Sequence, residues 1–408
     1  MAFSRKQLAI LAFPTTKYSA LVCDGAIRSG KTSVMSLSFV LWAMSEFDRQ
    51  NFAICGKSVE SAVRNIILPL IGVSYLPQHG FRLKYNTSKH CLTISRGRRV
   101  NYFYIYGGKD ESSYMLIQGI TLAGVMLDEV ALMPRSFVEQ ATGRCSVTGS
   151  RFWFNCNPEG PQHWFYEEWV KDEKQEKNRL HLHFLLDDNP SLDPEIKARY
   201  ERMYSGVFRE RYILGRWTKA EGLVYPMFDR EKHVVDTLPE RSSRHRYYVS
   251  VDYGVSNPFA AGLYDYDPIQ GRAVKIKELY YKGGSTNRVD NEAYYKMLRE
   301  FIGDYSIEYL IIDPSASSMI ETIQKYGEYM VVPADNDVLN GIQDVTKFMN
   351  TGSLLFYKDC VETFKEFGEY SWDEKKQKDT VIKENDHAMD EVRYFCRTAL
   401  RHELQWIV

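Results

Sequence analysis

Apolar residues in the first half of the chain form short runs that alternate with longer stretches of helical spacing. One such stretch is residues 32–44, which has the length and apolar spacing of a helix. Runs with the length and composition of strands lie at residues 20–23, 52–55, 101–106, 122–127 and 151–154. Strands that alternate with helices are typical of a wound, mostly parallel sheet. The pattern therefore predicts an α/β domain in residues 1–180.

A second series of strands begins after Arg246. Runs of strand character lie at residues 247–251, 260–266, 274–281 and 309–312. We expect helices at residues 287–303 and from Glu384 onward, because their apolar positions have helical spacing. These elements predict a further domain in residues 236–408.

The segment between the two series differs from both. A turn rich in capping residues at 187–190 precedes a helical stretch at 194–206 and a largely polar run at 209–217. We interpret residues 181–235 as a small helical lid and linker. His181 and His183 in this segment could bind a metal ion, but a spacing of two places both on one face of a strand. The strand is the favoured interpretation.

Length and composition indicate a soluble globular protein of two or three domains. The 408 residues exceed one hydrophobic core, and the 44% hydrophobic and 26% charged residues are ordinary values. Lys and Arg number 52 against 53 Asp and Glu, so bulk charge does not decide for or against a nucleic-acid partner. The seven cysteines form no Cys-x-x-Cys pair and are expected to be reduced thiols. Without a signal peptide or a long apolar run, we expect no secretion and no membrane contact.

Residues 25–32 read Gly-Ala-Ile-Arg-Ser-Gly-Lys-Thr, a complete phosphate-binding loop between an expected strand and an expected helix. Gly25 and Gly30 let backbone N–H groups, including that of Ser29, approach phosphate oxygens. Lys31 would neutralise the β- and γ-phosphates, and Thr32 would offer its hydroxyl to Mg²⁺. The loop predicts binding of a nucleoside triphosphate such as ATP. The alternative is a glycine-rich turn with an accidental lysine.

An apolar run at residues 122–127 ends in Asp128 and Glu129. In a phosphate-loop enzyme, Asp128 at the end of a strand would hold Mg²⁺ through water, and Glu129 would activate the attacking water as general base. Without the upstream loop, two carboxylates that cap a strand exit would be the simpler interpretation. With the loop, we expect the catalytic pair.

Amide side chains also lie near the expected phosphate site. Asn155 and Asn157 follow the strand at 151–154, where an amide could sense the γ-phosphate that hydrolysis removes. The alternative is a simple turn before Pro158. Gln7, upstream of the loop, is placed where its amide could pair with the adenine edge.

Carboxylates in the second half have the arrangement of a ribonuclease-H-like nuclease. Asp252 and Asp313 each follow a buried strand, and Asp386, His387 and Asp390 open the late helix, with Asp390 one turn after Asp386. Two divalent ions about 4 Å apart need such hard oxygen ligands to activate water and stabilise the leaving oxygen of a phosphodiester. We expect Asp252, Asp313 and Asp390 to be the catalytic metal ligands for Mg²⁺ or Mn²⁺, with Asp386 and His387 as further candidates. Each aspartate alone could be an ordinary cap.

The order of these motifs resembles that of the large terminase subunit of tailed bacteriophages and related prophages. The resemblance spans nearly the whole chain and is especially clear at residues 209–217 and 385–390. It implies a P-loop ATPase that drives double-stranded DNA through a portal into a preformed capsid, and an endonuclease that cuts the DNA concatemer. It also implies a portal protein and a small terminase subunit as partners, in the host cytoplasm. We expect a homo-oligomeric ring on the portal, while the isolated chain could be monomeric.

The same resemblance implies roles for single residues. Gln7 would read adenine, and Asn155 and Asn157 would lie in the segment that couples hydrolysis to DNA movement. Arg28 matches a basic residue that such motors often carry in the loop, where it would stabilise transition-state charge. One departure concerns the second metal position, where some relatives have glutamate and this chain has the shorter Asp313.

Two other function classes share parts of the pattern. A DNA-repair or recombination ATPase joined to a nuclease would carry additional helicase motifs, which are not evident in the sequence. A nucleotide-switched scaffold would have lost its catalytic carboxylates, and these are present. Basic clusters at residues 96–99 and 375–378 could grip the phosphate backbone of DNA without reading bases, or could be solvated turns.

Overall fold

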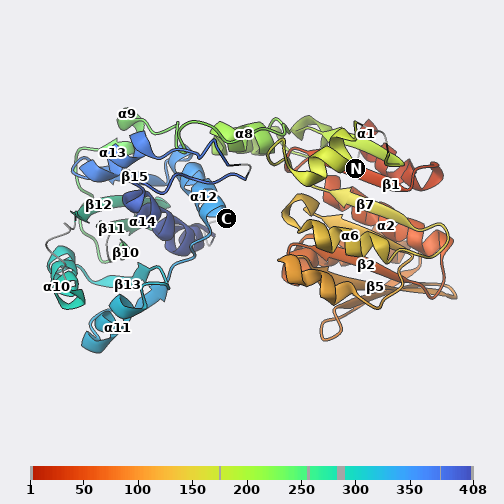
Figure 1. Ribbon diagram of the computed structural model, residues 1–408, viewed down its shortest axis with the longest axis horizontal. Coiled ribbons are helices and arrows are strands. Elements are labelled where there is room, and N and C mark those ends of the chain that lie inside the picture. Colours follow the sequence, from red (N-terminus) through yellow and green to blue (C-terminus); the bar gives the residue numbers. More distant parts are fainter. Residues whose placement is uncertain (1–2, 174–175, 255–257, 283–289, 377, 406–408) are drawn as a thin grey trace. The chain divides into compact units, whose positions relative to one another are not determined.

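The computed structural model describes residues 3–173, 176–254, 258–282, 290–376 and 378–405, and Figure 1 labels its elements. The chain divides into two compact units. The first unit contains Met1–Ala198 and Arg209–Lys219, and the second contains Arg199–Phe208 and Ala220–Val408. The segment expected to form a separate lid and linker, 181–235, is therefore divided between the two units.

The first unit is built on an eight-stranded sheet with the order β3-β4-β5-β2-β6-β7-β1-β8. The strands from β5 to β8 in this order pair in parallel, and β3, β4 and β5 form an antiparallel edge. The strand bounds are β1 Ala20–Gly25, β2 Asn51–Gly56, β3 Phe81–Asn86, β4 Cys91–Arg96, β5 Arg99–Gly107, β6 Gly124–Asp128, β7 Arg151–Asn155 and β8 Arg179–Phe184. β7 lies between β6 and β1, so the carboxyl ends of these three strands meet at one edge of the sheet.

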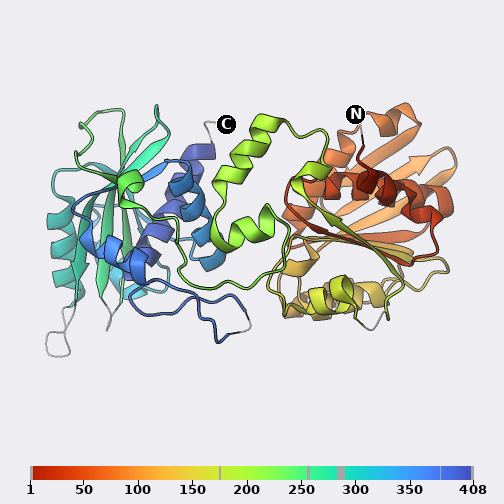
Figure 2. The same ribbon diagram turned by 90° about the horizontal axis from the view of Figure 1, so that it is seen from above.

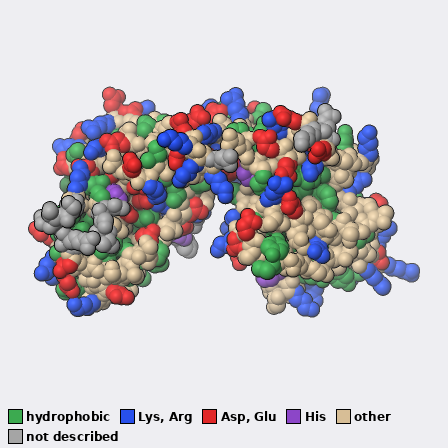
Figure 3. Space-filling view, in the orientation of Figure 1, with side chains coloured by type: hydrophobic (Ala, Val, Ile, Leu, Met, Phe, Trp, Pro, Cys, Tyr) green, Lys and Arg blue, Asp and Glu red, His purple; other side chains and the backbone are tan. Residues whose placement is uncertain are grey.

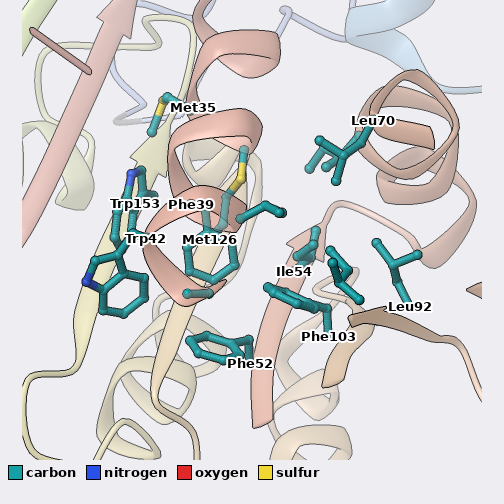
Figure 4. Close-up of a cluster of buried hydrophobic side chains, with 14 of the residues drawn as sticks. Met35, Phe39, Trp42, Phe52, Ile54, Leu70, Leu92, Phe103, Met126 and Trp153 are labelled. Carbon is teal, nitrogen blue, oxygen red and sulfur yellow. The ribbon is translucent and has the colours of Figure 1, made fainter. Parts of the chain in front are cut away.

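Helices cover both faces of this sheet. Residues of α2 pack with Leu21 and Cys23 of β1 in one buried cluster, while residues of α6 pack with Ala20 and Val22 in the other. Figure 4 shows the first cluster, where Phe52 and Phe103 stack with ring centroids 4.9 Å apart. The helix bounds are α1 Arg5–Ala12, α2 Lys31–Glu46, α3 Val59–Ala62, α4 Leu68–Ile71, α5 Tyr75–Gln78, α6 Arg135–Gly143, α7 Pro194–Met203 and α8 Gly206–Tyr212.

The second unit contains a seven-stranded sheet with the order β14-β13-β10-β11-β12-β15-β9. β10, β11 and β12 form an antiparallel meander, and β10 also pairs in parallel with β13. The strand bounds are β9 Val234–Val235, β10 Arg246–Asp252, β11 Phe259–Asp267, β12 Arg272–Tyr281, β13 Ile307–Ile312, β14 Val331–Pro333 and β15 Leu354–Tyr357. The ends of β10 and β13 therefore lie side by side.

Helices also pack against the second sheet, as the turned view in Figure 2 shows for this unit. Their bounds are α9 Arg230–His233, α10 Asn291–Ile302, α11 Ser317–Tyr326, α12 Val338–Asn350, α13 Val361–Glu369, α14 His387–Phe395 and α15 Arg401–Gln405. Residues 287–289, which were expected to begin a helix, lie outside the described residues, as does Gln377 in the basic run at 375–378.

Two global expectations can be compared with the structure. Both sheets are mixed and largely parallel with helices packed against them, which agrees with the predicted α/β class. Basic and acidic side chains are intermixed over the face shown in Figure 3. No helix in the described ranges is long and apolar enough to cross a membrane.

Candidate functional site

The predicted phosphate loop joins the end of β1 to the start of α2. Gly25 has a φ of +119°, and a Cβ at this position would lie 2.0 Å from the carbonyl oxygen of Phe184 in β8. Gly30 has a φ of +83° and directly precedes α2. Glycine adopts these conformations at low cost and leaves room for the adjacent backbone. The two glycines of the motif are therefore required by the shape of the loop.

Lys31 begins α2 and is buried. Its Nζ donates hydrogen bonds to the carbonyl oxygens of Gly25 at 3.1 Å and Ala26 at 2.7 Å. It also lies 3.4 Å from Oδ1 of Asn157. Burial lowers the pKa of Lys31, while nearby anionic groups, Asp24 and Asp128 among them, oppose that shift. The ammonium group is thus held inside the loop by backbone oxygens.

Polar side chains from α2, β6 and β7 meet beside this lysine. Thr32 Oγ1 donates to Oδ1 of Asp128 at 3.0 Å, and Asn155 Nδ2 donates to the same carboxylate oxygen at 2.5 Å. Asn155 Nδ2 also lies 2.6 Å from Thr32 Oγ1. Burial raises the pKa of Asp128, and the hydrogen bonds from Thr32 and Asn155 act against that rise. Asn155 reaches both partners because β7 lies between β6 and the phosphate loop.

A cavity of about 540 Å³ collects these groups. Glu129 lies on its wall in the left-handed region, with a φ of +57°, a backbone conformation that costs free energy and is concentrated at functional sites. Burial and the adjacent charge of Asp128 raise the pKa of Glu129, against the attraction of Arg64. The lining consists of residues 27–33, Arg64, Asn65, Pro69, Asp128, Glu129, residues 155–157 and Asn189.

In the second unit, Asp252 is the last residue of β10 and Asp313 directly follows β13, as expected from the sequence. The two strands pair in parallel. Helix α14 packs against β10 and β11, where Ser250 Oγ donates to the carbonyl oxygen of Glu391 at 2.8 Å. Tyr394 of α14 donates from its hydroxyl to Oδ2 of Asp313 at 3.2 Å. Burial and then the charges of Asp390, Asp252 and Asp313 raise the pKa of Tyr394. The Tyr394 hydroxyl therefore contacts Asp313 and is also affected by the charges of Asp390 and Asp252.

Basic side chains neutralise this acidic cluster. His387 Nδ1 lies 2.8 Å from Oδ2 of Asp252, and Lys383 Nζ lies 3.2 Å from Oδ2 of Asp386 and 3.1 Å from Oδ2 of Asp390. Burial lowers the pKa of His387, but the hydrogen bond to Asp252 and nearby negative charge outweigh it and raise the value. Burial raises the pKa of Asp252, against the hydrogen bond from His387.

The start of α14 is fixed by a carboxylate from another helix. Asp386 occupies the N-cap position but makes no side-chain capping bond. Glu366 of α13 instead accepts from the backbone N–H groups of Ala388 at 2.7 Å and Met389 at 3.1 Å. Glu366 thus satisfies donors that a helix leaves open at its first turn. The Asp386 carboxylate consequently remains on the side of the aspartate cluster, next to Lys383.

The donor set has the chemistry that Mg²⁺ or Mn²⁺ requires, since it consists of carboxylate oxygens with one imidazole beside them. Within the described ranges, however, no three acidic, histidine or cysteine side chains converge as one group that could hold a metal ion. Asp390 is also paired with Arg393, whose NH2 atom lies 2.8 Å from Oδ1. The oxygen ligands are thus of the type that binds a hard cation. In this structure Lys383, His387 and Arg393 pair with the carboxylates of Asp252, Asp386 and Asp390.

Comparison with known proteins agrees with the two sites. Residues 22–232 match the family model "Terminase large subunit, T4likevirus-type, N-terminal". The chain is 47% identical to the large terminase from a thermophilic bacteriophage over 98% of this chain and 100% of that one, with a TM-score of 0.91. The chain belongs to the large terminase subunit family.

Structures of the same thermophilic bacteriophage's large terminase in complex with ADP and with ATP-γ-S are also similar to this chain. Each is 46% identical and covers 98% of this chain and 100% of that one, with TM-scores of 0.89 for the ADP complex and 0.88 for the ATP-γ-S complex. Among curated proteins, nothing matches. A large terminase is a DNA-packaging ATPase with a nuclease, so the predicted fold class and function are confirmed. Family membership also decides against the repair ATPase and the scaffold.

The structure brings most of the predicted nucleotide residues of the terminase together. Within the cavity wall are Arg28, Ser29, Gly30, Lys31, Thr32, Asp128, Glu129, Asn155 and Asn157. Gln7 and Gly25 are not part of that wall. Gln7 is buried behind the loop, where its Nε2 donates to the carbonyl oxygen of Ser29 at 3.3 Å and its Oε1 accepts from the backbone N–H of Ser4 at 3.0 Å. The role of Gln7 in adenine recognition stays a prediction.

Several residues of both sites were missed by sequence reasoning. Asn189 lines the cavity, and its Nδ2 donates to the carbonyl oxygen of Arg28 at 2.7 Å. Arg64 and Asn65 also line the cavity and come from a helical turn after β2. In the second unit, Lys383 and Glu366 were not recognised. The turn at residues 187–190 was an available signal, because an asparagine in a turn can bond to nearby backbone groups.

Proposed function

We propose that this terminase hydrolyses ATP in the cavity of the first unit and cuts double-stranded DNA at the aspartate cluster of the second. The observation that carries the first part is the hydrogen bond between Thr32 and Asp128 beside Lys31. A hydroxyl and a carboxylate at this place are the two groups that hold Mg²⁺ in phosphate-loop enzymes. The similar large terminase of the thermophilic bacteriophage has been observed with ADP and ATP-γ-S, which supports ATP as the nucleotide.

Each group in the cavity has a proposed role. Lys31 neutralises the β- and γ-phosphates, and Glu129 polarises the attacking water. The raised pKa of Glu129 supports a general base, since a carboxylate with a higher pKa accepts a proton more readily. Asn155 and Asn157 sense the γ-phosphate. Arg28 lies on the cavity wall, where its guanidinium can stabilise transition-state charge.

At the second site, Asp252, Asp313 and Asp390 are proposed to bind Mg²⁺ or Mn²⁺, with Asp386 and His387 as additional ligands or orienting groups. Two bound ions would activate water and stabilise the leaving oxygen of the phosphodiester. The protein's own contribution is to place the carboxylates at the ends of β10 and β13 and on α14. Glu366 bonds the first turn of α14, and the Asp386 carboxylate pairs with Lys383, which also contacts Asp390.

The partners follow from the family. We propose that the chain acts in the host cytoplasm with double-stranded DNA, a portal protein and a small terminase subunit, as a homo-oligomeric ring on the portal. A ring is needed because several subunits must act in turn on one DNA duplex. Electron microscopy of portal-bound complexes checks the ring directly. A single bound copy would contradict it.

The ATPase assignment is tested with Glu129→Gln in the full chain. This variant keeps the shape of the side chain but removes the base, so turnover should fall by about 10²- to 10⁴-fold while ATP-γ-S binding is preserved. Glu139→Gln is the matched control, because Glu139 is an exposed residue of α6 that pairs with Arg135. Steady-state ATP hydrolysis and nucleotide titration measure both quantities. Normal turnover in Glu129→Gln would refute the assigned base.

Arg28→Ala separates two roles of the loop arginine. If Arg28 acts on the transition state, kcat falls and KM changes little. The same hydrolysis assay measures both parameters. A rise in KM with unchanged kcat would make Arg28 a ground-state contact only.

A further inference from the structure

Asp24 is a buried carboxylate at the end of β1, immediately before Gly25, and only 1% of its surface is exposed. Three side chains converge on it. His181 Nε2 and His183 Nδ1 lie 2.8 Å and 3.1 Å from Oδ1, and Trp217 Nε1 donates to Oδ2 at 2.7 Å. Because a carboxylate only accepts, both imidazoles donate to it. The histidine pair of the sequence therefore serves one carboxylate on the neighbouring strand.

The Asp24 carboxylate is ionised despite its burial. Burial alone raises the pKa of Asp24, but the hydrogen bonds and charges of His181 and His183 outweigh it and hold the pKa well below its ordinary value. Its negative charge also acts on Lys31, whose pKa it raises. Asp24 thus connects β8, Trp217 and the lysine of the phosphate loop.

Trp217 belongs to residues 209–219, here called the strap segment. This segment lies beside the phosphate loop in space. The N–H of Ile27 donates to the carbonyl oxygen of Tyr212 at 2.9 Å. At Gly215, with a φ of +68°, a Cβ would lie 3.3 Å from the backbone nitrogen of Ala26. The strap segment therefore bonds to the chain at Ile27 and at Asp24, and Gly215 lies close to Ala26 between these two bonds.

The strap segment also has a distinctive place in the chain. It belongs to the first unit, but the residues before it, Arg199–Phe208, and after it, from Ala220, belong to the second unit. It is braced internally by the buried Arg211, whose NH2 atom donates to the carbonyl oxygen of Thr218 at 2.6 Å. The strap segment is therefore a short, internally bonded piece of chain between two stretches of the second unit.

Lys31 joins the nucleotide site to the part of the loop between these contacts. Lys31 Nζ donates to the carbonyl oxygens of Gly25 and Ala26, which lie between Asp24 and Ile27. A phosphate is a stronger acceptor for an ammonium group than a neutral carbonyl, because the hydrogen bond joins two charges. When a triphosphate takes Lys31, these two carbonyls lose their donor. Gly25 and Ala26 lie between Asp24 and Ile27, the two residues that bond to the strap segment. The lost hydrogen bonds are therefore next to those two contacts.

We propose that Asp24 and Trp217 form a nucleotide-responsive contact that ties the phosphate loop to the strap segment. The inference rests on the proposed nucleotide site. Trp217 is a positioning residue, since it acts through Asp24 and the loop. The contact passes the occupancy of the phosphate site to the strap segment.

Trp217→Phe tests the contact in the full-length protein. Phenylalanine preserves an aromatic ring against Tyr166, whose ring centroid lies 4.9 Å from that of Trp217, but it has no N–H for Asp24. ATP-γ-S and ADP are titrated while tryptophan fluorescence and hydrogen exchange of residues 209–219 are recorded. Both signals should change with nucleotide in the wild type and be lost in Trp217→Phe, although the variant still binds nucleotide. Trp169→Phe, in the same unit, is the matched control and should retain both signals.

The outcomes separate the two proposals. Nucleotide binding with an unchanged exchange response of residues 209–219 in Trp217→Phe would overturn the contact alone. Failure of the wild type to bind either nucleotide would overturn the proposed nucleotide site and the contact with it. If Trp217→Phe does not fold, Asp24→Asn replaces it. An asparagine cannot accept from all three donors, so the exchange response should again be lost, and its persistence would overturn the proposal.

Discussion

The nucleotide cavity and the aspartate cluster are both built where the carboxyl ends of parallel strands meet, yet they balance charge differently. In the first unit, Lys31 comes from the phosphate loop itself and is held by its carbonyl oxygens. In the second, Lys383 bridges Asp386 and Asp390, His387 pairs with Asp252, and Asp313 accepts from the hydroxyl of Tyr394. The first site is assembled before its ligand arrives. The second has its carboxylates in place, but protein cations pair with Asp252, Asp386 and Asp390.

The difference follows from the ligand charge. A nucleotide phosphate is an anion, so its site needs cations and N–H groups, which a glycine-rich loop provides without any other partner. A two-ion nuclease site is anionic, and its carboxylates repel one another until cations bind. Lysine, arginine and histidine side chains near the cluster reduce that repulsion. The comparison predicts that the two sites respond separately to mutation, pH and metal ions.

The largest expected effect on stability is confined to the second unit. Lys275 Nζ lies 2.6 Å from Oε2 of Glu391, and both side chains are almost fully buried. Lys275→Met leaves a buried carboxylate without its partner, which should cost about 3 to 5 kcal/mol of unfolding free energy. Urea unfolding should show the transition of the second unit at a lower urea concentration and the transition of the first unit unchanged. Lys282→Met is the control, because its exposed pair with Glu362 should contribute less than about 1 kcal/mol.

A smaller effect belongs to the first unit and depends on pH. Asp24→Asn leaves one donor without an acceptor, so unfolding free energy at pH 7 should fall by about 1.5 to 3 kcal/mol. Because the pKa of Asp24 is depressed in the folded protein, its contribution is present above the ordinary value of 3.8 and lost as pH falls through the folded-state pKa. Urea titrations at decreasing pH should therefore show the variant and wild type converging below that value. A pH-independent difference would contradict the assigned cause.

The smallest expected effect concerns metal affinity. The Lys383 side chain is 57% exposed, so its pairing with Asp386 and Asp390 is screened by water. Lys383→Met removes a cation that competes with metal, and Mn²⁺ binding should tighten by up to about fivefold, less than about 1 kcal/mol. Isothermal titration calorimetry measures it, with the exposed Lys375→Met as control. Weaker Mn²⁺ binding would show that Lys383 supports the ion site instead of competing with it.

Much of the fold and the core of each site could be predicted because the signals are local. The phosphate loop is contiguous, and its glycines are fixed by backbone geometry at Gly25 and Gly30. Asp252 and Asp313 follow apolar runs, and parallel strand ends meet at one edge of a sheet. The strands that carry them, β10 and β13, pair in parallel, which brings the two aspartates to neighbouring strand ends.

Other features could not be predicted because they depend on contacts between distant segments. The sequence suggests Asp386 as the cap of α14, but its side chain makes no capping bond. Glu366 of α13 caps the helix instead. His181 and His183 were correctly placed on a strand, but their common partner, Asp24, is 157 and 159 residues away. Residues 181–235 are divided between the two units, because β8 pairs within the first sheet and the strap segment belongs to the first unit.

The independence of the two sites is measured most directly with both activities in the same preparations. Full-length protein is incubated with plasmid DNA and Mn²⁺ without nucleotide, and ATP hydrolysis is assayed in parallel. Asp252→Ala, Asp313→Ala and Asp390→Ala should each reduce DNA cutting by about 10³-fold or more, because an incomplete ligand set loses an ion. ATP turnover should stay at the wild-type level, as should both activities in the exposed control Asp359→Ala. Three aspartate variants that cut DNA as well as the wild type would contradict the assignment of the second site.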